Sequence, residues 1–501
     1  MIGFVCSSGR NYCSAFVAFG ALVTMTLSLS ACGSGSSSPA MPSSASTGTI
    51  NVSISDPPSC KNPNGSFMHV YITVRSVQAH IDPNASDNSS GWQELAPQLA
   101  SQPMQIDLFS SAQTNCVLAQ LGSASLPVGN YQQIRLLLVS NTPPGSDAVP
   151  ASNACAGHGY NCAVLSDSSI HELALSSQAN TGLKIPPGQI VGGPIQVNAG
   201  QSVDLNIDFN ACASIVQEGN GTFRLKPTLT AGQISPNNSG IGGQIVDSST
   251  KMPISGNVLV AVEQPDSAGV DRIVMETAAD ANGNFRFCPL PMGTFDIVAV
   301  AVGPNNLPYN ATAVLNVPNG TNLATVPLVA ETGAPSPAIL QGFVTASTSS
   351  GGASVDVSLR ALQTVTSGMN ATRQLTIPLE TVPATSTSPE VDSTGLISIS
   401  SNTNCPAGAP AGANCGSYTL VVPGSNPSVA MYSTSGFSYL PPPGGDVLFA
   451  VSASAALPDS GGVVDCMPNS VTTSSDINNQ PLKAVAGSAT SVARIDFTGC
   501  S

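Results

Sequence analysis

The stretch Ile50-Asn51-Val52-Ser53-Ile54-Ser55 decides the fold class, because apolar and polar side chains alternate along it without a break. Successive side chains of a β-strand point to opposite faces, so the three apolar residues are predicted to face a core and the polar residues the other way. Runs with the same period of two recur between turns rich in Gly, Pro and Asn, at residues 70–74, 134–138, 203–209, 223–225, 355–359, 418–422, 447–451 and 495–497. They predict an all-β protein, a multidomain chain of β-sandwiches, with two short helical pieces at residues 116–121 and 170–175.

Charged residues are scarce in this chain. Only 8% of the 501 residues are charged, against about 25% in ordinary soluble domains. Ser, Thr, Asn, Gly and Pro take their place, which suits short strands and many turns. The net charge of −14 argues against a nucleic-acid partner and against a domain lying flat on anionic lipid. The length suggests about three domains.

The first 31 residues have the order of a signal peptide. Residues 15–29 form an apolar segment, shorter than the roughly 20 residues needed to span a bilayer. Leu29-Ser30-Ala31-Cys32 closes this segment and resembles the lipobox of bacterial lipoproteins. The resemblance implies that residues 1–31 are removed, that Cys32 is lipidated and attaches the protein to a membrane, and that residues 32–48 form a flexible tether. No aspartate follows Cys32, which favours the outer membrane of the cell envelope; an uncleaved transmembrane anchor is the competing interpretation.

The chain contains 13 cysteines, of which Cys6, Cys13 and Cys32 belong to the predicted signal peptide and lipidation site. The remaining even number indicates disulfides in an exported chain, because the cell exterior is oxidising. Sequence does not determine the connectivity, but three pairings are candidates: Cys155–Cys162, Cys405–Cys415 and Cys466–Cys500. The pairing of four others stays open, namely Cys60, Cys116, Cys212 and Cys288.

Residues 49–231 resemble a family of bacterial lipoprotein domains, domain-of-unknown-function family 4382. The matching stretches run in order along the segment, beginning with the opening strand and the Asp56-Pro57-Pro58 turn and continuing through residues 69–74, 126–136, 182–185, 207–209, 214–216 and 225–227. The resemblance implies a β-rich fold and a cell-envelope location, and it implies no activity because the family has none assigned. The chain departs from the family in a cysteine-containing insertion at residues 155–162 and in Asn210, where a second acidic residue is expected.

Residues 238–330 resemble a second family, the carboxypeptidase regulatory-like domain. Pro253-Ile254-Ser255-Gly256-Asn257-Val258 matches its Pro-Ile-x-Gly-x-Val step, and residues 280–287 and 290–295 match its hairpin and the strand start that follows. The family has a β-sandwich related to starch-binding-like folds, so the resemblance implies a spacer or a carbohydrate-binding module. Residues 336–501 lack such a motif, and a diverged β-sandwich fits their alternating runs best.

No stretch carries a complete catalytic or metal-binding motif. His171-Glu172 begins like a zinc-protease motif, but Leu175 stands where the second histidine is required. Asp280-Ala281-Asn282-Gly283-Asn284 spaces oxygen atoms like a calcium loop, yet the same residues suit a hairpin turn. Arg135 and Asp208 lie inside strand patterns and are candidates for a buried ion pair. We expect no metal, no cofactor and no catalytic residues.

These patterns predict a non-catalytic cell-envelope protein with a binding or structural role and a glycan or an envelope protein as candidate ligand. One alternative is a carbohydrate-binding accessory protein that uses residues 238–330, which exposed aromatic side chains there would favour. The other is an envelope hydrolase assembled from scattered Asp and Glu residues, which two carboxylates facing into a cleft would favour. Trp92 is the only tryptophan, whereas Tyr309, Tyr432 and Tyr439 lie near turns and are expected to be exposed.

Overall fold

The computed structural model describes residues 46–55, 67–86, 88–110, 119–175, 182–185, 189–209, 214–217, 222–225, 229–234, 240–266, 268–291, 293–331, 333–334, 336–366, 372–379, 395–399, 401–403, 405–435, 437–440, 442, 444–456, 466–468 and 470–500. All of them belong to one compact unit, Ala45–Ser501. Cys32, the predicted signal peptide and most of the predicted tether lie outside the described residues.

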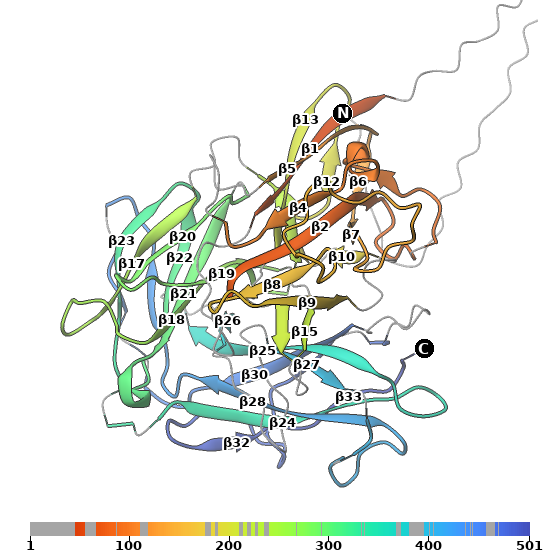
Figure 1. Ribbon diagram of the computed structural model, residues 1–501. Coiled ribbons are helices and arrows are strands. Elements are labelled where there is room, and N and C mark those ends of the chain that lie inside the picture. The colour runs from red at the N-terminus through yellow and green to blue at the C-terminus, as the bar shows by residue number, and fades with distance from the viewer. Residues whose placement is uncertain are drawn as a thin grey trace, which may run out of the picture. The chain divides into compact units, whose positions relative to one another are not determined.

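Strands dominate the described residues, which confirms the all-β prediction (Figure 1). Residues 47–233 form a five-stranded sheet in the order β11-β16-β13-β1-β5, with β1 (Thr47–Ser55), β5 (Ala119–Pro127), β11 (Ile190–Val191), β13 (Ser202–Phe209) and β16 (Leu229–Gln233). A nine-stranded sheet contains β2 (Phe67–His80), β3 (Gln93–Glu94), β4 (Met104–Asp107), β7 (Gln133–Leu138), β8 (Cys162–Leu165), β9 (Ile170–Leu175), β10 (Leu183–Ile185), β14 (Ile215–Gln217) and β15 (Phe223–Leu225). β6 (Gly129–Tyr131) pairs with β12 (Ile195–Val197), and a 3-10 helix, η1 (Pro97–Ala100), contacts β2 and β5.

Residues 241–497 form three further sheets in the described part of the chain. A three-stranded sheet has the order β20-β17-β23, with β17 (Ile241–Asp247), β20 (Asn284–Phe287) and β23 (Asn322–Leu328). A ten-stranded sheet has the order β29-β22-β21-β18-β19-β26-β25-β30-β31, with β27 also on β25, and comprises β18 (Asn257–Pro265), β19 (Val270–Ala278), β21 (Thr294–Val302), β22 (Thr312–Pro318), β25 (Val355–Thr366), β26 (Thr372–Ile377), β27 (Leu396–Ile399), β29 (Ser428–Met431), β30 (Phe449–Ala456) and β31 (Ser470–Thr473). A four-stranded sheet contains β24 (Ala338–Ala346), β28 (Asn414–Val422), β32 (Ala489–Ser491) and β33 (Ile495–Phe497), and a second 3-10 helix, η4 (Pro304–Asn306), follows β21.

Each large apolar cluster lies between two sheets, as in a β-sandwich. The first draws on the five-stranded and nine-stranded sheets, with Val52 and Ile72 among its fully buried members. The second joins the three-stranded sheet to strands β18, β21 and β22. The third joins β25 and β30 to the four-stranded sheet. The domain boundaries expected at residues 231–238 and 330–336 stay predictions. The ten-stranded sheet contains strands from before and after residues 330–336.

The apolar residues of β1 are buried as its alternating sequence predicts, but only some of its polar residues are exposed to solvent. Ile50, Val52 and Ile54 are buried as predicted, but Ser53 and Ser55 are buried as well. β13 runs parallel to β1 and its side chains bond to both serine hydroxyls. Ser53 and Ser55 therefore contact protein instead of water, whereas Thr49 and Asn51 on the same face are exposed or partly exposed.

The helical piece expected at residues 170–175 is wrong, because those residues form β9. β9 pairs antiparallel with β8 and parallel with β15, so sheet pairing outweighs the weak local preference of so short a segment. Of the other expected piece, residues 119–121 begin β5, and residues 116–118 lie outside the described part of the chain. No helix among the described residues has the length and apolar character needed to cross a membrane.

Disulfides join the three cysteine pairs that their positions singled out: Cys155–Cys162, Cys405–Cys415 and Cys466–Cys500. Cys288 is disulfide-bonded as well. Cys60, Cys116 and Cys212 lie outside the described residues.

Tyr418 provides a test of how the third core is packed. Its side chain is 1% exposed, and its hydroxyl has no hydrogen-bond partner among the described residues. A buried unpaired hydroxyl costs about 1–3 kcal/mol of desolvation. We expect Tyr418→Phe to raise the free energy of unfolding by about 1 kcal/mol in urea titrations. Tyr432→Phe, on a half-buried ring, is the matched control and should change little; a loss of stability in Tyr418→Phe would contradict this interpretation.

Candidate functional site

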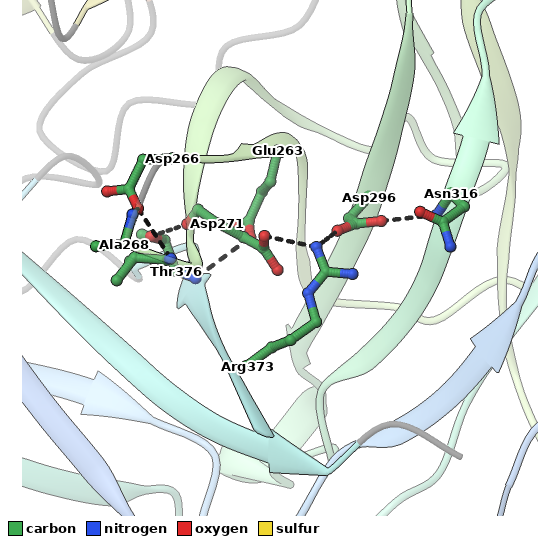
Figure 2. Close-up of polar contacts among 9 residues, drawn as sticks. Glu263, Asp266, Ala268, Asp271, Asp296, Asn316, Arg373 and Thr376 are labelled. Carbon is green, nitrogen blue, oxygen red and sulfur yellow. Dashed lines mark hydrogen bonds and ion pairs between the residues drawn. The ribbon is translucent and has the colours of Figure 1, made fainter. Parts of the chain in front are cut away.

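Four strands of the ten-stranded sheet carry a group of ionisable side chains that lie close together and are largely buried (Figure 2). We call Glu263, Asp271, Asp296 and Arg373 the carboxylate cluster. Glu263 and Asp271 are fully buried and Asp296 is 2% exposed, whereas the Arg373 side chain is 20% exposed. Sequence reasoning missed all four residues. The available signal was an acid that ends an apolar run, as in Leu259-Val260-Ala261-Val262-Glu263.

Strand pairing brings these residues together from distant parts of the chain. β18 and β21 run antiparallel and place Glu263 directly opposite Asp296. β18 and β19 form the neighbouring antiparallel pair, which carries Asp271. β26 then lies parallel to β19 and places Arg373 two residues before Leu375, the partner of Asp271. Such neighbours lie within reach of long side chains.

Arg373 is the cation that the cluster shares. Its Nη2 donates to Asp271 Oδ1 at 2.7 Å and also to Asp296 Oδ2. The backbone N–H of Thr376 donates to Glu263 Oε2 at 3.3 Å. Glu263 Oε1 and Asp271 Oδ2 have no hydrogen-bond partner among the described residues. The guanidinium thus bonds two of the three carboxyl groups, and the third, Glu263, accepts from a backbone N–H.

Burial decides how these carboxyl groups titrate. It raises the pKa of Asp271 to about 6, although Arg373 pulls that pKa down. It raises the pKa of Asp296 as well, and that of Glu263 well above its ordinary range, where the nearby Asp271 and Asp296 charges add to the effect. Desolvation dominates in each case because a low-dielectric interior disfavours the charged form.

The arrangement does not match a hydrolytic site. Glycosidase carboxylates flank a cleft that admits a sugar and a water molecule. Asp271 and Asp296 instead bond to one nitrogen of Arg373 and are closed off from solvent. Among the described residues, no group of three or more His, Cys, Asp or Glu side chains is placed to hold a metal ion.

The outer face of the three-stranded sheet carries a groove of about 660 Å³. Its floor is open because Gly242 of the central strand β17 has no side chain. Its rims are polar, and the full lining consists of Gly242, Gly243, Gln244, Asp280, Asn284, Phe285, Arg286, Asn322, Ala324 and Thr325. Planar amides, a hydroxyl and a guanidinium are the groups that bind a hydroxyl-rich ligand through paired hydrogen bonds.

Aromatic side chains do not line this groove as a stacking surface. All four aromatic residues between positions 238 and 330 are buried: Phe285, Phe287, Phe295 and Tyr309. The expected exposure of Tyr309 is therefore wrong. Its ring packs into the second core and its hydroxyl donates to Asp247 Oδ2 at 3.0 Å, and burial with this bond raises the pKa of Tyr309 to about 12. Tyr432 and Tyr439 are half-buried against the same core.

Trp92 is partly exposed, and its ring packs against other side chains. The Arg135 guanidinium lies 4.1 Å from the centre of its ring, and the His80 ring lies 5.1 Å away. Its Nε1 donates to the carbonyl of Ser86 at 3.0 Å. This arrangement is a cation–π contact that holds the loop before β3 in place. Arg135 thus has a partner other than Asp208.

The two incomplete motifs have structural roles. His171 Nε2 lies 3.0 Å from Ser169 Oγ, and its ring contacts Phe223. Asp280 Oδ1 accepts hydrogen bonds from the backbone N–H groups of Asn282 and Asn284, at 2.9 and 2.8 Å. These bonds lower the pKa of Asp280 and close the hairpin turn before β20.

Asp208 ends a chain of buried polar groups between β1 and β13. Ser53 Oγ donates to Asn206 Oδ1 at 3.0 Å, and Asn206 Nδ2 donates to Ser55 Oγ at 2.7 Å. Ser55 Oγ in turn donates to Asp208 Oδ1 at 3.0 Å. Burial raises the pKa of Asp208 to about 7, against the opposing effect of the Ser55 bond. The carboxyl group is thus partly protonated at neutral pH.

Removal of the shared cation should destabilise the protein strongly. Breaking a buried ion pair by deleting one partner costs about 3–5 kcal/mol, and the partial exposure of Arg373 places Arg373→Met near the lower figure. Lys483→Met removes a surface pair with Asp446 and is the control, with an expected loss below about 1 kcal/mol. Urea titrations at neutral pH measure both, and equal small losses would show that the cluster needs no cation.

The pH dependence of stability should respond to Asp208. Its folded pKa lies above its unfolded value of 3.8, so the native state binds more protons between about pH 4 and pH 7 and stability falls as pH rises through that window. Asp208→Asn removes this contribution, and we expect a shallower fall in the free energy of unfolding from acidic to neutral pH. Urea titrations at several pH values measure the slope; an unchanged slope would mean that Asp208 titrates normally.

Comparison with known proteins bears on the N-terminal segment most directly. No curated protein matches the chain. Among solved structures, the Bacillus anthracis TIE protein aligns at 9% identity and a TM-score of 0.15, over 90% of this chain and 51% of that one, so this chain spans about half its length. The shaft pilin SpaA of Lactobacillus rhamnosus GG aligns at 10% identity and a TM-score of 0.16, over 57% of this chain and 98% of that one. A streptococcal ancillary pilin aligns at 10% identity and a TM-score of 0.15, over 80% of this chain and 96% of that one. TM-scores this low support no argument about function.

The family comparison agrees with the resemblance stated for the N-terminal segment. The resemblance of residues 238–330 to the carboxypeptidase regulatory-like family stays a prediction. Residues 47–227 match the model of the family described as "Domain of unknown function (DUF4382)".

Proposed function

We propose that the protein is a lipid-anchored component of the bacterial cell envelope, attached through Cys32, with a non-catalytic structural or binding role. The order of apolar segment, small residues and cysteine supports the anchor. Three disulfides, bonded in the described residues, support export to an oxidising compartment. We place the anchor in the outer membrane because no aspartate follows Cys32.

The observation that carries the non-catalytic role is the closure of the carboxylate cluster. Asp271 and Asp296 are buried and both bond to Arg373. Hydrolysis by a pair of carboxylates needs access for substrate and water, which a buried cluster does not offer.

Lipid attachment is tested by metabolic labelling with an alkyne-bearing fatty acid, followed by detergent phase partition. We expect the full-length protein to be labelled and to enter the detergent phase, because acyl chains bury many CH₂ groups in lipid. Cys32→Ser should abolish the label. Cys13→Ser, which changes a cysteine inside the predicted signal peptide, is the control and should stay labelled. Label retained by Cys32→Ser would refute the proposed anchor.

A second candidate function is carbohydrate binding, and the groove over β17 favours it. The polar side chains at its rims can hydrogen-bond to sugar hydroxyls, and the glycine floor lets a carbohydrate chain lie close to the sheet. The buried aromatic residues argue for weak binding through hydrogen bonds, without ring stacking.

Carbohydrate binding is tested by a glycan-array screen with the full-length protein in detergent, followed by titration of any hit. Gly242→Leu fills the groove floor, since an added Cβ there lies 3.2 Å from the carbonyl oxygen of Phe285 and points at no closer atom. We expect it to lower affinity at least about tenfold, or about 1.4 kcal/mol. Gly145→Leu, at an exposed loop glycine with open space around it, is the control. If the folded wild-type protein bound no glycan, or if both variants bound equally well, carbohydrate binding in this groove would be refuted and only the structural role would remain.

A further inference from the structure

Within the ten-stranded sheet, strands β19 and β26 pair over a very short stretch, which we call the joint. These two strands pair in parallel through only two register positions, Val270↔Gln374 and Asp271↔Leu375. By contrast, β25 and β26 on the far side of the joint pair over six positions. A parallel ladder is also slightly weaker per residue than an antiparallel one. Side-chain contacts therefore contribute much of what holds β26 against β19.

The side-chain contacts of β26 are made with acidic residues on three other strands. Thr376 Oγ1 donates to the backbone carbonyl of Asp271 at 2.6 Å, and Thr376 N–H donates to Glu263 Oε2 at 3.3 Å. Arg373 donates to the carboxyl groups of Asp271 and Asp296. β26 is thus tied to β18, β19 and β21 by groups whose charge depends on pH (Figure 2).

The charges around the joint do not balance when every carboxyl group is ionised. Glu263 on β18, Asp271 on β19 and Asp296 on β21 then give three negative charges against the single positive charge of Arg373 on β26. Glu276 on β19, which is also buried, adds a further negative charge near Glu263. Two charges of one sign in a dry site repel strongly, and proteins relieve this by retaining a proton.

The geometry identifies where protons are retained. Asp271 and Asp296 are both buried and both bond to one nitrogen of Arg373, so their carboxyl groups lie close together and both can be ionised only at a high electrostatic cost. Glu263 is fully buried, and its Oε1 has no hydrogen-bond partner among the described residues. An ionised carboxylate is costly in that position, whereas a protonated one is neutral.

We propose that the carboxylate cluster is a proton-dependent latch, which holds β26 against β19 while its carboxyl groups retain protons and loosens when they are released. The proposal uses the same cluster as the argument for a non-catalytic role, but it is independent of the lipid anchor and of the groove, whose tests change Cys32 and Gly242.

The sign of the pH effect follows from the raised pKa values. Burial raises the pKa of Asp271 to about 6, and it raises those of Glu263 and Asp296 as well. The closed joint binds more protons than the open joint between the ordinary pKa near 4 and these raised values, so rising pH favours opening in that window. The latch is therefore tighter in mildly acidic medium than above neutrality.

Hydrogen exchange of the full-length protein, read by mass spectrometry at about pH 5 and about pH 8 and corrected for intrinsic exchange rates, tests the latch. We expect protection of peptides covering residues 372–377 to fall about tenfold or more at the higher pH, since one pKa unit of difference corresponds to a factor of ten. Peptides covering β28, which lies in the four-stranded sheet, are the internal reference for any general change in stability, and they should lose less protection than residues 372–377. An equal loss at β28 would mean general destabilisation and would overturn the latch.

Glu263→Gln is the decisive variant, because an amide has nearly the shape of a protonated carboxyl group and cannot ionise. We expect it to retain protection of residues 372–377 at about pH 8 and to flatten the pH dependence. Asp446→Asn, on a carboxylate that is 61% exposed, is the matched control and should behave like wild type. Asp296→Asn repeats the test if Glu263→Gln does not fold. A wild-type pH dependence in the folded variants would overturn the proposal.

Discussion

A single guanidinium lies where strands from two distant stretches of the chain meet in one sheet. Arg373 reaches Asp271 on the adjacent strand and Asp296 two strands further on. The two stretches pair over only two positions there, so this contact adds side-chain bonds where the backbone ladder of the ten-stranded sheet is short. Replacing such a cluster with apolar residues would also be compatible with folding, and buried charge is therefore more informative about specificity than about stability.

The N-terminal segment uses a comparable arrangement between β1 and β13. These strands are parallel and far apart in sequence, and a chain of buried hydrogen bonds from Ser53 to Asp208 connects them. A slip of one residue would turn these polar groups towards the apolar core, at the cost of unpaired buried groups. In both places a buried carboxyl group helps to define one register.

Most of the acidic and aromatic side chains discussed above contribute to packing. Few charges are available overall, and among the described residues the most closely packed acids are enclosed by strands. Trp92 and the aromatic residues of the middle segment serve packing instead of ligand contact. The groove over β17 is the described feature with the open polar lining that a ligand requires.

Sequence by itself determined the fold class, because strand periodicity is a local property that Ile50, Val52 and Ile54 display without reference to any partner. It also pointed to the three disulfide pairs and to the family-like segment at residues 49–231, which overlaps the match at residues 47–227. It did not reveal the burial of Ser53, the strand at residues 170–175 or the enclosure of Tyr309, since each depends on what a neighbouring strand covers. The carboxylate cluster was out of reach for the same reason: Glu263 and Arg373 are 110 positions apart in the numbering, and only the pairing of β19 with β26 brings one to the other. Strand periodicity depends on neighbouring residues in the sequence, whereas burial and charge balance depend on which strands the tertiary structure brings together.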